Sequence, residues 1–185
     1  ADGTVEKAKE LGFDVIHQHN KGEGNALRIG TDSTKSDFVM FFSPDGNDRP
    51  EDIQKLIQKT NEGNDVVHIS RFGKTSISDD AGWLDRFGNN MFTFLVNVFF
   101  GGNYTDSLNG FRIFKRDAFE RLETQSESLT IDQETYIRAL KKKLKFCEID
   151  GDEPSRIGGE RKMKPIITGS QLGWQIIKEF FYWKK

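Results

Sequence analysis

The sequence predicts a single α/β domain with a mostly parallel sheet and helices on both faces. Short apolar runs alternate with segments of helical spacing, which is the pattern of a sheet covered by helices. Polar residues follow directly after several of the apolar runs, as they do where strands end at the open edge of such a sheet. The chain has 185 residues, enough for one domain with a proper core.

The first half of the chain alternates helices and strands that are marked by breakers. Gly12 ends the first helix, and Pro50 suits the start of a later one. In chain order, the expected elements are a helix over 5–11, a strand over 13–18, a helix beginning near 26, a strand over 38–43, a helix over 50–63 and a strand over 65–70.

The second half opens with the most apolar helix. Leu84, Phe87, Met91 and Phe94 recur at spacings of three and four, which predicts a helix over 83–100. The remaining expected elements are a strand over 111–114, helices over 117–122 and 131–144, and a strand over 145–149. We expect a domain body over 1–168 and a separate aromatic C-terminal helix over 169–185.

The turn after the strand 38–43 carries the strongest chemical signal. The apolar run ends abruptly in Asp45, Gly46 and Asn47. A carboxylate at the carboxyl end of a strand can hold a divalent cation that bridges phosphates. The same turn could simply cap the strand by accepting backbone hydrogen bonds. The turn alone supports both interpretations equally.

Two further patterns could bind phosphate. The glycine-rich loop 20–25 precedes a helix, where backbone N–H groups and the helix dipole favour an anion, although an ordinary tight turn explains it as well. Arg71, Arg86, Arg112 and Arg156 stand in polar settings. Guanidinium groups that converge on one cleft bind phosphate, whereas isolated ones are solvated surface charges.

Composition excludes several classes of protein. Lys plus Arg (27) nearly balance Asp plus Glu (29), so no general nucleic-acid partner is expected. The single cysteine, Cys147, excludes an internal disulfide. No apolar run reaches the length of a membrane span. No Gly-x-Ser-x-Gly motif of a serine hydrolase occurs.

Short motifs spread over almost the whole chain resemble one known family. In order, they are Asp2-Gly3-Thr4, Lys21-Gly22-Glu23-Gly24-Asn25-Ala26, Ser43-Pro44-Asp45-Gly46-Asn47, Ile69-Ser70-Arg71-Phe72, Asp106-Ser107-Leu108-Asn109-Gly110-Phe111-Arg112 and Ile131-Asp132-Gln133-Glu134. Each is permissive alone, but their order and spacing are specific. Together they resemble the inverting family 2 glycosyltransferases of the Rossmann-like GT-A fold, and within them the dolichol-phosphate mannosyltransferase-like branch.

The resemblance implies an enzyme that moves a hexose from a nucleotide-diphosphate sugar to a polyprenyl phosphate, dolichyl or undecaprenyl, with the help of Mg²⁺ or Mn²⁺. It implies metal ligands, nucleotide-sugar contacts and acceptor-phosphate contacts. The metal ligands would be Asp45 and Asn47. The nucleotide-sugar contacts would be Asp2, Lys21, Gly22, Gly24, Asn25 and Asp45. The acceptor-phosphate contacts would be Arg71, Arg86, Asn90 and Arg156. The catalytic set would be Asp45, Arg71, Arg86, Arg156, Asp106 and Asp132.

Two rival functions stay open at this point. A saccharide hydroxyl acceptor, as in polysaccharide synthesis, would need a general base, for which Asp106 and Asp132 are the candidates. A loop cap and a helix N-cap explain these two residues equally well. Ser43 stands where the family has the first Asp of its metal-binding motif. A catalytically silent sugar-nucleotide-binding domain is therefore the second rival.

Both ends of the chain carry expectations of their own. The family's first strand and most of its Asp-Gly-Ser loop have no counterpart here, so we expect the sheet to lack an N-terminal strand and this form to lack part of its nucleotide pocket. The aromatic and lysine residues of 169–185 suit an interfacial helix on a membrane, although a helix packed on the domain or in a homodimer is an equal alternative. We expect a peripheral protein at the cytoplasmic face of a membrane.

Overall fold

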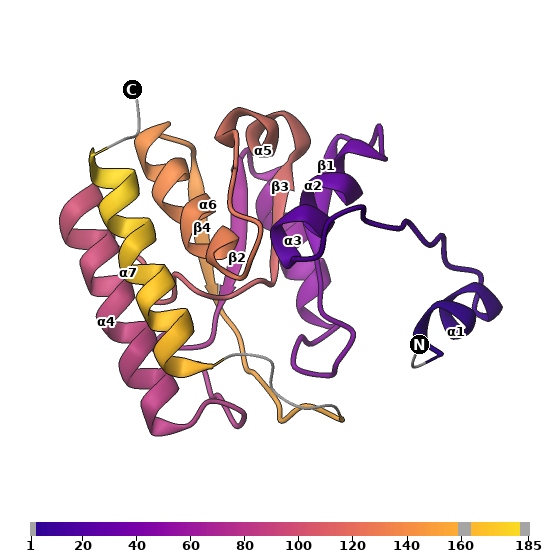
Figure 1. Ribbon diagram of the computed structural model, residues 1–185, viewed down its shortest axis with the longest axis horizontal. Coiled ribbons are helices and arrows are strands. Elements are labelled where there is room, and N and C mark those ends of the chain that lie inside the picture. Colours follow the sequence, from indigo (N-terminus) through magenta and orange to yellow (C-terminus); the bar gives the residue numbers. More distant parts are fainter. Residues whose placement is uncertain (1–2, 159–163, 182–185) are drawn as a thin grey trace.

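The computed structural model describes residues 3–158 and 164–181, which form a sheet covered by helices (Figure 1). The helices are α1 (Thr4–Glu10), α2 (Glu23–Asp32), α3 (Asp52–Asn61), α4 (Trp83–Phe100), α5 (Arg116–Leu122), α6 (Thr130–Lys141) and α7 (Pro165–Phe181). The strands are β1 (Phe38–Phe41), β2 (Val66–Ser70), β3 (Arg112–Lys115) and β4 (Phe146–Asp150). The α/β class is therefore confirmed.

The sheet has the strand order β1-β3-β2-β4 and is mixed. β2 and β4 pair in parallel, but β3 pairs antiparallel with both β1 and β2, which corrects the expected mostly parallel sheet. The reason lies in the segment before β3. Phe111 accepts a backbone hydrogen bond from Ile69, so the chain returns to the end of β2 before β3 begins. From that point β3 has to run back against its neighbour.

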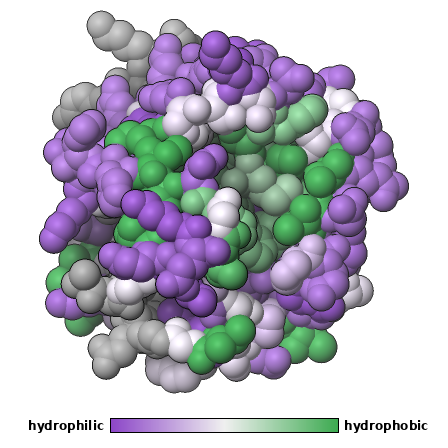
Figure 2. All heavy atoms as spheres, turned by 90° about the vertical axis from the view of Figure 1, so that its right-hand side faces the viewer, coloured by the Kyte–Doolittle hydropathy of each residue, from purple (hydrophilic) through white to green (hydrophobic). Residues whose placement is uncertain are grey.

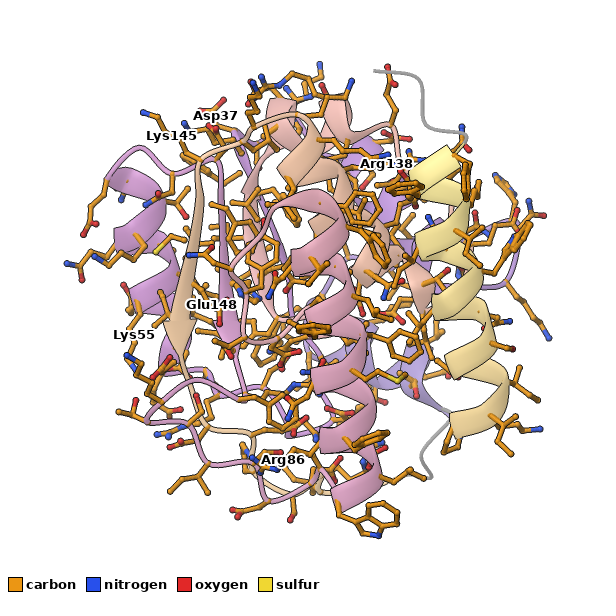
Figure 3. The ribbon with its side chains drawn as sticks, turned by 90° about the vertical axis from the view of Figure 1, so that its left-hand side faces the viewer. Asp37, Lys55, Arg86, Arg138, Lys145 and Glu148 are labelled. Atoms are coloured by element: carbon orange, nitrogen blue, oxygen red, sulfur yellow. The ribbon has the colours of Figure 1, made fainter. Side chains whose placement is uncertain are left out.

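Helices cover both faces of the sheet, as expected. On one face, Leu56 of α3 packs with Val67 and Ile113. On the other face, Phe119 of α5 and Ala139 of α6 pack with strand residues. A third core joins α4, α6 and α7, and Figures 1 and 3 show α4 and α7 side by side outside α6.

The expected strand over 13–18 is wrong, because this segment has no strand assignment. A strand needs a hydrogen-bonded neighbour, and none of the described strands pairs with these residues. Phe13 remains 65% exposed. Helix α1 buries no residue and stands apart from the sheet (Figure 1).

Helix α7 packs against the domain body through Leu172 and Ile176, while Trp174 and Phe181 remain exposed. It begins at Pro165, so the expected boundary at residue 168 stays a prediction. No helix among the described residues combines the length and apolarity needed to cross a bilayer. Asp2, Trp183, Lys184 and Lys185 lie outside the described residues.

Candidate active site

A cleft of about 380 Å³ lies where β1 and β2 end. It gathers residues from several expected motifs. Its polar lining is formed by Glu23, Ser43, Asp45, Asn47, Asp48, Arg71, Asn109, Asp132, Glu153 and Arg156. A larger hollow of about 740 Å³ lies beside β4 but contains none of the predicted site residues. The cleft therefore brings together four of the six predicted catalytic residues: Asp45, Arg71, Arg156 and Asp132.

The turn after β1 places two residues in the cleft whose side-chain oxygen atoms could bind a cation, Asp45 and Asn47. The Asp45 carboxylate is 35% exposed, and its Oδ1 accepts the Asn47 backbone N–H at 3.3 Å. Asn47 is only 8% exposed, and its Oδ1 has no hydrogen-bond partner among the described residues. A buried carbonyl oxygen without a donor is costly unless a ligand satisfies it.

The donors of this turn fit a divalent cation. Carboxylate and amide oxygens are hard ligands of the kind that Mg²⁺ and Mn²⁺ take. No metal-binding group of three or more acidic, histidine or cysteine side chains occurs within residues 3–158 and 164–181. Asp45 and Asn47 would therefore share a cation with substrate oxygens. Ser43 stands where the resemblance places the first Asp of the metal-binding motif. Its backbone N–H donates to Asp48 Oδ2 at 2.7 Å.

Arg71 follows β2 directly and is held by two carboxylates. Its Nε and Nη2 donate to Asp106 at 2.7 and 3.1 Å, and its Nη1 donates to Glu153 at 3.2 Å. Asp106 is fully buried. Burial alone would raise the pKa of its carboxyl, but the Arg71 charge and hydrogen bonds outweigh burial and lower that pKa. Asp106 is thus an ionised partner that orients Arg71.

Arg86 and Asn90 lie in the N-terminal half of α4, outside the cleft lining. Arg86 shares a contact with Arg71. The guanidinium groups of Arg71 and Arg86 stand 5.2 and 5.0 Å from the centre of the Phe72 ring. The negative face of an aromatic ring attracts such cations. Phe72 therefore holds two like charges near one another. Arg86 and Asn90 are both exposed, and Figure 3 shows Arg86 near the N-terminal end of α4.

Arg156 reaches the cleft from a segment that follows β4. This segment is bound on both sides: Ile157 donates to the Asp45 carbonyl at 2.9 Å, and Glu153 donates to the Ile77 carbonyl at 2.9 Å. The Arg156 side chain donates to Asp80 at 3.0 Å and lies 4.0 Å from the Asp45 carboxylate. Arg71 and Arg156 therefore line the same cleft, whereas Arg86 does not belong to its lining.

Asp132 enters the cleft from the first turn of α6. It forms a buried ion pair with Arg112 of β3. Burial raises the pKa of Asp132, against the opposing charge of Arg112. Glu23 lies nearby, since both carboxylates approach the Cβ position of Gly110 within 4.0 Å. Burial and the charge of Asp132 raise the pKa of Glu23 to about 7.

The glycines of the loop 20–25 are required by packing. A Cβ atom at Gly22 or Gly24 would stand 2.1 or 1.9 Å from the carbonyl oxygens of Glu127 and Ser126. Asn25 binds within the loop, donating to the Lys21 carbonyl at 3.2 Å and accepting from Arg28 at 2.7 Å. Of this loop, Glu23 lines the cleft, whereas the predicted nucleotide-sugar contacts Lys21, Gly22, Gly24 and Asn25 are not among its lining residues.

Three acidic residues of the cleft were missed by the sequence analysis. Glu23 stands between the two motif glycines, a position that could have been noted. Asp48 carried a weaker signal in the polar turn after β1, and burial raises the pKa of its carboxyl to about 7. Glu153 had no recognisable signal in the sequence, because it meets Arg71 only through the way the segment after β4 folds.

Residues 1–123 match the family model described as glycosyl transferase family 2. The chain belongs to this family. The resemblance inferred from the motifs is therefore confirmed at the level of the family.

Curated relatives of this glycosyltransferase come from archaea and bacteria. The dolichyl-phosphate hexose transferase of Haloferax volcanii is 27% identical over 96% of this chain and 76% of its own length. The glycosyltransferase AglJ of the same organism is 27% identical over 91% of this chain. The UDP-N-acetylglucosamine–dolichyl-phosphate N-acetylglucosaminyltransferase of Methanococcus voltae is 30% identical over 73% of this chain. The chain spans 56% of the length of AglJ and of the Methanococcus enzyme.

Solved structures share the fold of this family 2 glycosyltransferase. Glucosyl-3-phosphoglycerate synthase from Mycobacterium tuberculosis in complex with UDP gives a TM-score of 0.74 at 16% identity, covering 100% of this chain and 67% of that one. The same enzyme with Mn²⁺, UDP-glucose and phosphoglyceric acid gives a TM-score of 0.71 at 17% identity, covering 97% and 64%. These matches confirm the expected GT-A type of fold.

Proposed function

We propose that the protein transfers a hexose from a nucleotide-diphosphate sugar to a polyprenyl phosphate, with inversion at the anomeric carbon and with a divalent cation. The observation that carries this proposal is the arrangement of opposite charges in one cleft. Oxygen atoms of Asp45 and Asn47 line this cleft together with the guanidinium groups of Arg71 and Arg156, and Arg156 lies 4.0 Å from the Asp45 carboxylate. Relatives named for dolichyl phosphate support the choice of acceptor.

The arginines suit an acceptor that is already charged. An acceptor phosphate oxygen attacks the anomeric carbon, the bond from that carbon to the diphosphate oxygen breaks, and the nucleoside diphosphate leaves with the electron pair. No proton has to be removed from the attacking oxygen, because it is ionised at neutral pH. Arg71, fixed by Asp106 and Glu153, would bind this phosphate through the remaining N–H groups of Nη1 and Nη2.

The donor diphosphate would lie at the turn after β1. Asp45 and Asn47 would hold the divalent cation there, and when bound the cation would offset the charge that develops on the leaving diphosphate. Complexes of glucosyl-3-phosphoglycerate synthase with Mn²⁺ and UDP-glucose support this choice of cofactor. The closeness of Arg156 to Asp45 would let one guanidinium serve both phosphates.

A saccharide hydroxyl is the second candidate acceptor, favoured by one observation. Asp132 lines the cleft, and its raised pKa suits a general base better than the lowered pKa of Asp106 does. Its ion pair with the buried Arg112 gives Asp132 a structural role as well.

A transfer assay separates the two acceptors. Radiolabelled UDP-glucose, UDP-N-acetylglucosamine and GDP-mannose would be offered with Mn²⁺ and either undecaprenyl phosphate or free saccharides. We expect label on the lipid, a loss of turnover of about 100-fold or more in Arg71→Ala and in Asp45→Ala, and residual turnover in Asp132→Asn. Label on the saccharide, abolished in Asp132→Asn, would favour the hydroxyl acceptor. Metal-dependent nucleotide binding that persists in Asp45→Ala would refute the metal site.

We also propose that the face formed by α4 and α7 rests on a membrane surface, where a lipid-linked acceptor is met. Aromatic and aliphatic side chains of both helices stay exposed, with Trp83 at 81% and Phe94 at 63%. Large exposed apolar patches mark interaction surfaces, and aromatic residues favour the membrane interface. The cytoplasmic face and a homodimer stay predictions.

A further inference from the structure

A narrow crevice of about 60 Å³ lies between α4 and α7. Its walls are mostly apolar and include Leu84, Phe92, Leu108 and Leu172. Leu108 also lines the main cleft, so the crevice adjoins the place where Arg71 stands. At its outer side the crevice meets the exposed apolar face of α4 and α7, the two helices in front in Figure 3.

One polar side chain lies at this crevice without a protein partner. Asn89 is 3% exposed, and neither its Nδ2 nor its Oδ1 has a hydrogen-bond partner among the described residues. A buried amide without partners is destabilising, so such a group is expected to meet a polar atom of a ligand or a water molecule. Helix α4 carries Asn89 one turn beyond Arg86.

We infer that this crevice binds the isoprene units next to the phosphate of the lipid acceptor, with the Asn89 amide donating to the phosphate ester oxygen. This inference rests on the proposed function. A polyprenyl phosphate held by Arg71 and Arg86 has to carry its hydrocarbon from a charged cleft to an apolar surface. The crevice is an apolar path between them, and Asn89 lies where a single polar atom of that amphiphile would pass.

Two glycines of α7 provide a matched pair of variants. Gly169 lines the crevice, and a Cβ atom there would stand 3.8 Å from the Phe92 ring, an ordinary contact. Gly173, one turn further on, meets nothing within 4 Å and does not line the crevice. Gly169→Leu would therefore fill the crevice, whereas Gly173→Leu makes the same chemical change on the same helix outside it.

Steady-state transfer by the intact protein tests the inference. We expect Gly169→Leu to raise the KM for undecaprenyl phosphate about tenfold. The new leucine would displace part of the lipid from the crevice, and the apolar burial lost is of the size of one side chain, which corresponds to about such a factor. Gly173→Leu should stay within about twofold of the wild type, and the KM for the nucleotide sugar should not change in either variant. Equal KM values for the lipid in both variants would overturn the crevice but leave the proposed function intact. A wild type that labels no lipid would refute the proposed function itself.

Asn89→Leu adds a readout that a purely structural role would not give. Removing the unpartnered amide should raise the melting temperature, whereas losing its bond to the ester oxygen should raise the KM for the lipid about threefold or more. A higher melting temperature with an unchanged KM would show that Asn89 does not contact the acceptor. A lower melting temperature would show that water or protein already satisfies the amide, and would also contradict the inference.

Discussion

At the scale of single residues, Arg71 and Asp106 predict a large effect of a small change. Replacing Asp106 by Asn leaves a mostly buried guanidinium with one carboxylate instead of two. Removing one partner of a buried ion pair costs about 3 to 5 kcal/mol of the free energy of unfolding. We expect such a loss in urea unfolding of Asp106→Asn. Asp117→Asn, which removes an exposed carboxylate 3.9 Å from Arg121, is the control and should change the free energy by less than about 0.5 kcal/mol.

Glu23 predicts how stability depends on pH. Its pKa is raised to about 7 in the folded protein, so the folded state binds its proton more tightly than the unfolded state does. The stabilisation from the protonated carboxyl is present at low pH and is lost as the pH rises from the unfolded value of 4.5 to about 7. In Glu23→Gln, the decrease in the free energy of unfolding over this pH range should be smaller by roughly 1 to 3 kcal/mol. Chemical unfolding at several pH values measures it, with Glu6→Gln on the exposed helix α1 as the control for loss of one charge. An unchanged pH profile in Glu23→Gln would refute the assignment.

Sequence patterns singled out Asp45 and Arg71, which follow apolar strands closely, and Arg156, which stands in a basic, glycine-rich segment. The structure places all three in the lining of one cleft. The patterns could not predict the partners of these residues. The bond from Arg71 to Glu153 joins segments that are remote in the chain. The meeting of Glu23 with Asp132 depends on how α2 and α6 pack, which no local pattern encodes.

At the scale of elements, helix α2 offers a test of the close packing at its start. Gly24→Ala would place a Cβ atom 1.9 Å from the Ser126 carbonyl oxygen, so backbone has to shift and we expect a loss of about 2 kcal/mol or more. Gly30→Ala lies on the same helix with nothing within 4 Å, and it should stabilise the protein by about 0.5 to 1 kcal/mol through helix propensity. Urea unfolding of both variants makes the comparison. Equal effects would show that the loop 125–129 does not constrain α2.

The elements that could be predicted are those whose signals are local. The spacing of apolar residues gave the bounds of α4, and Gly12 and Gly63 marked helix ends. The segment 13–18 has the composition of a strand but pairs with none of the strands in the described part of the chain, so its prediction failed. The direction of β3 was not predictable either, because a long-range backbone contact between Ile69 and Phe111 determines it.

At the scale of the whole molecule, the apolar face of α4 and α7 predicts binding to vesicles. Phe94→Ser should weaken cosedimentation with phospholipid vesicles about tenfold, since burial of one aromatic side chain is worth about 1.5 kcal/mol or more. Phe13→Ser is the matched control, because Phe13 is 65% exposed and Phe94 is 63% exposed. Equal loss in both variants, or no vesicle binding by the wild type, would argue against membrane contact through this face.

The 4.0 Å approach of Arg156 to Asp45 has a consequence for the order of events in the cleft. A cation bound to Asp45 would offset the attraction that now draws the guanidinium toward that carboxylate, and would leave Arg156 available to a second anion. Donor and acceptor would then bind cooperatively, and such coupling acts equally in both directions. We expect acceptor phosphate to bind about fivefold or more tightly once Mn²⁺ and nucleoside diphosphate are present, as calorimetry can measure. In Arg156→Lys the side chain is shorter and lacks the planar guanidinium, so this cooperativity should be much smaller. Such a result would show that Arg156 couples the binding of the donor to the binding of the acceptor.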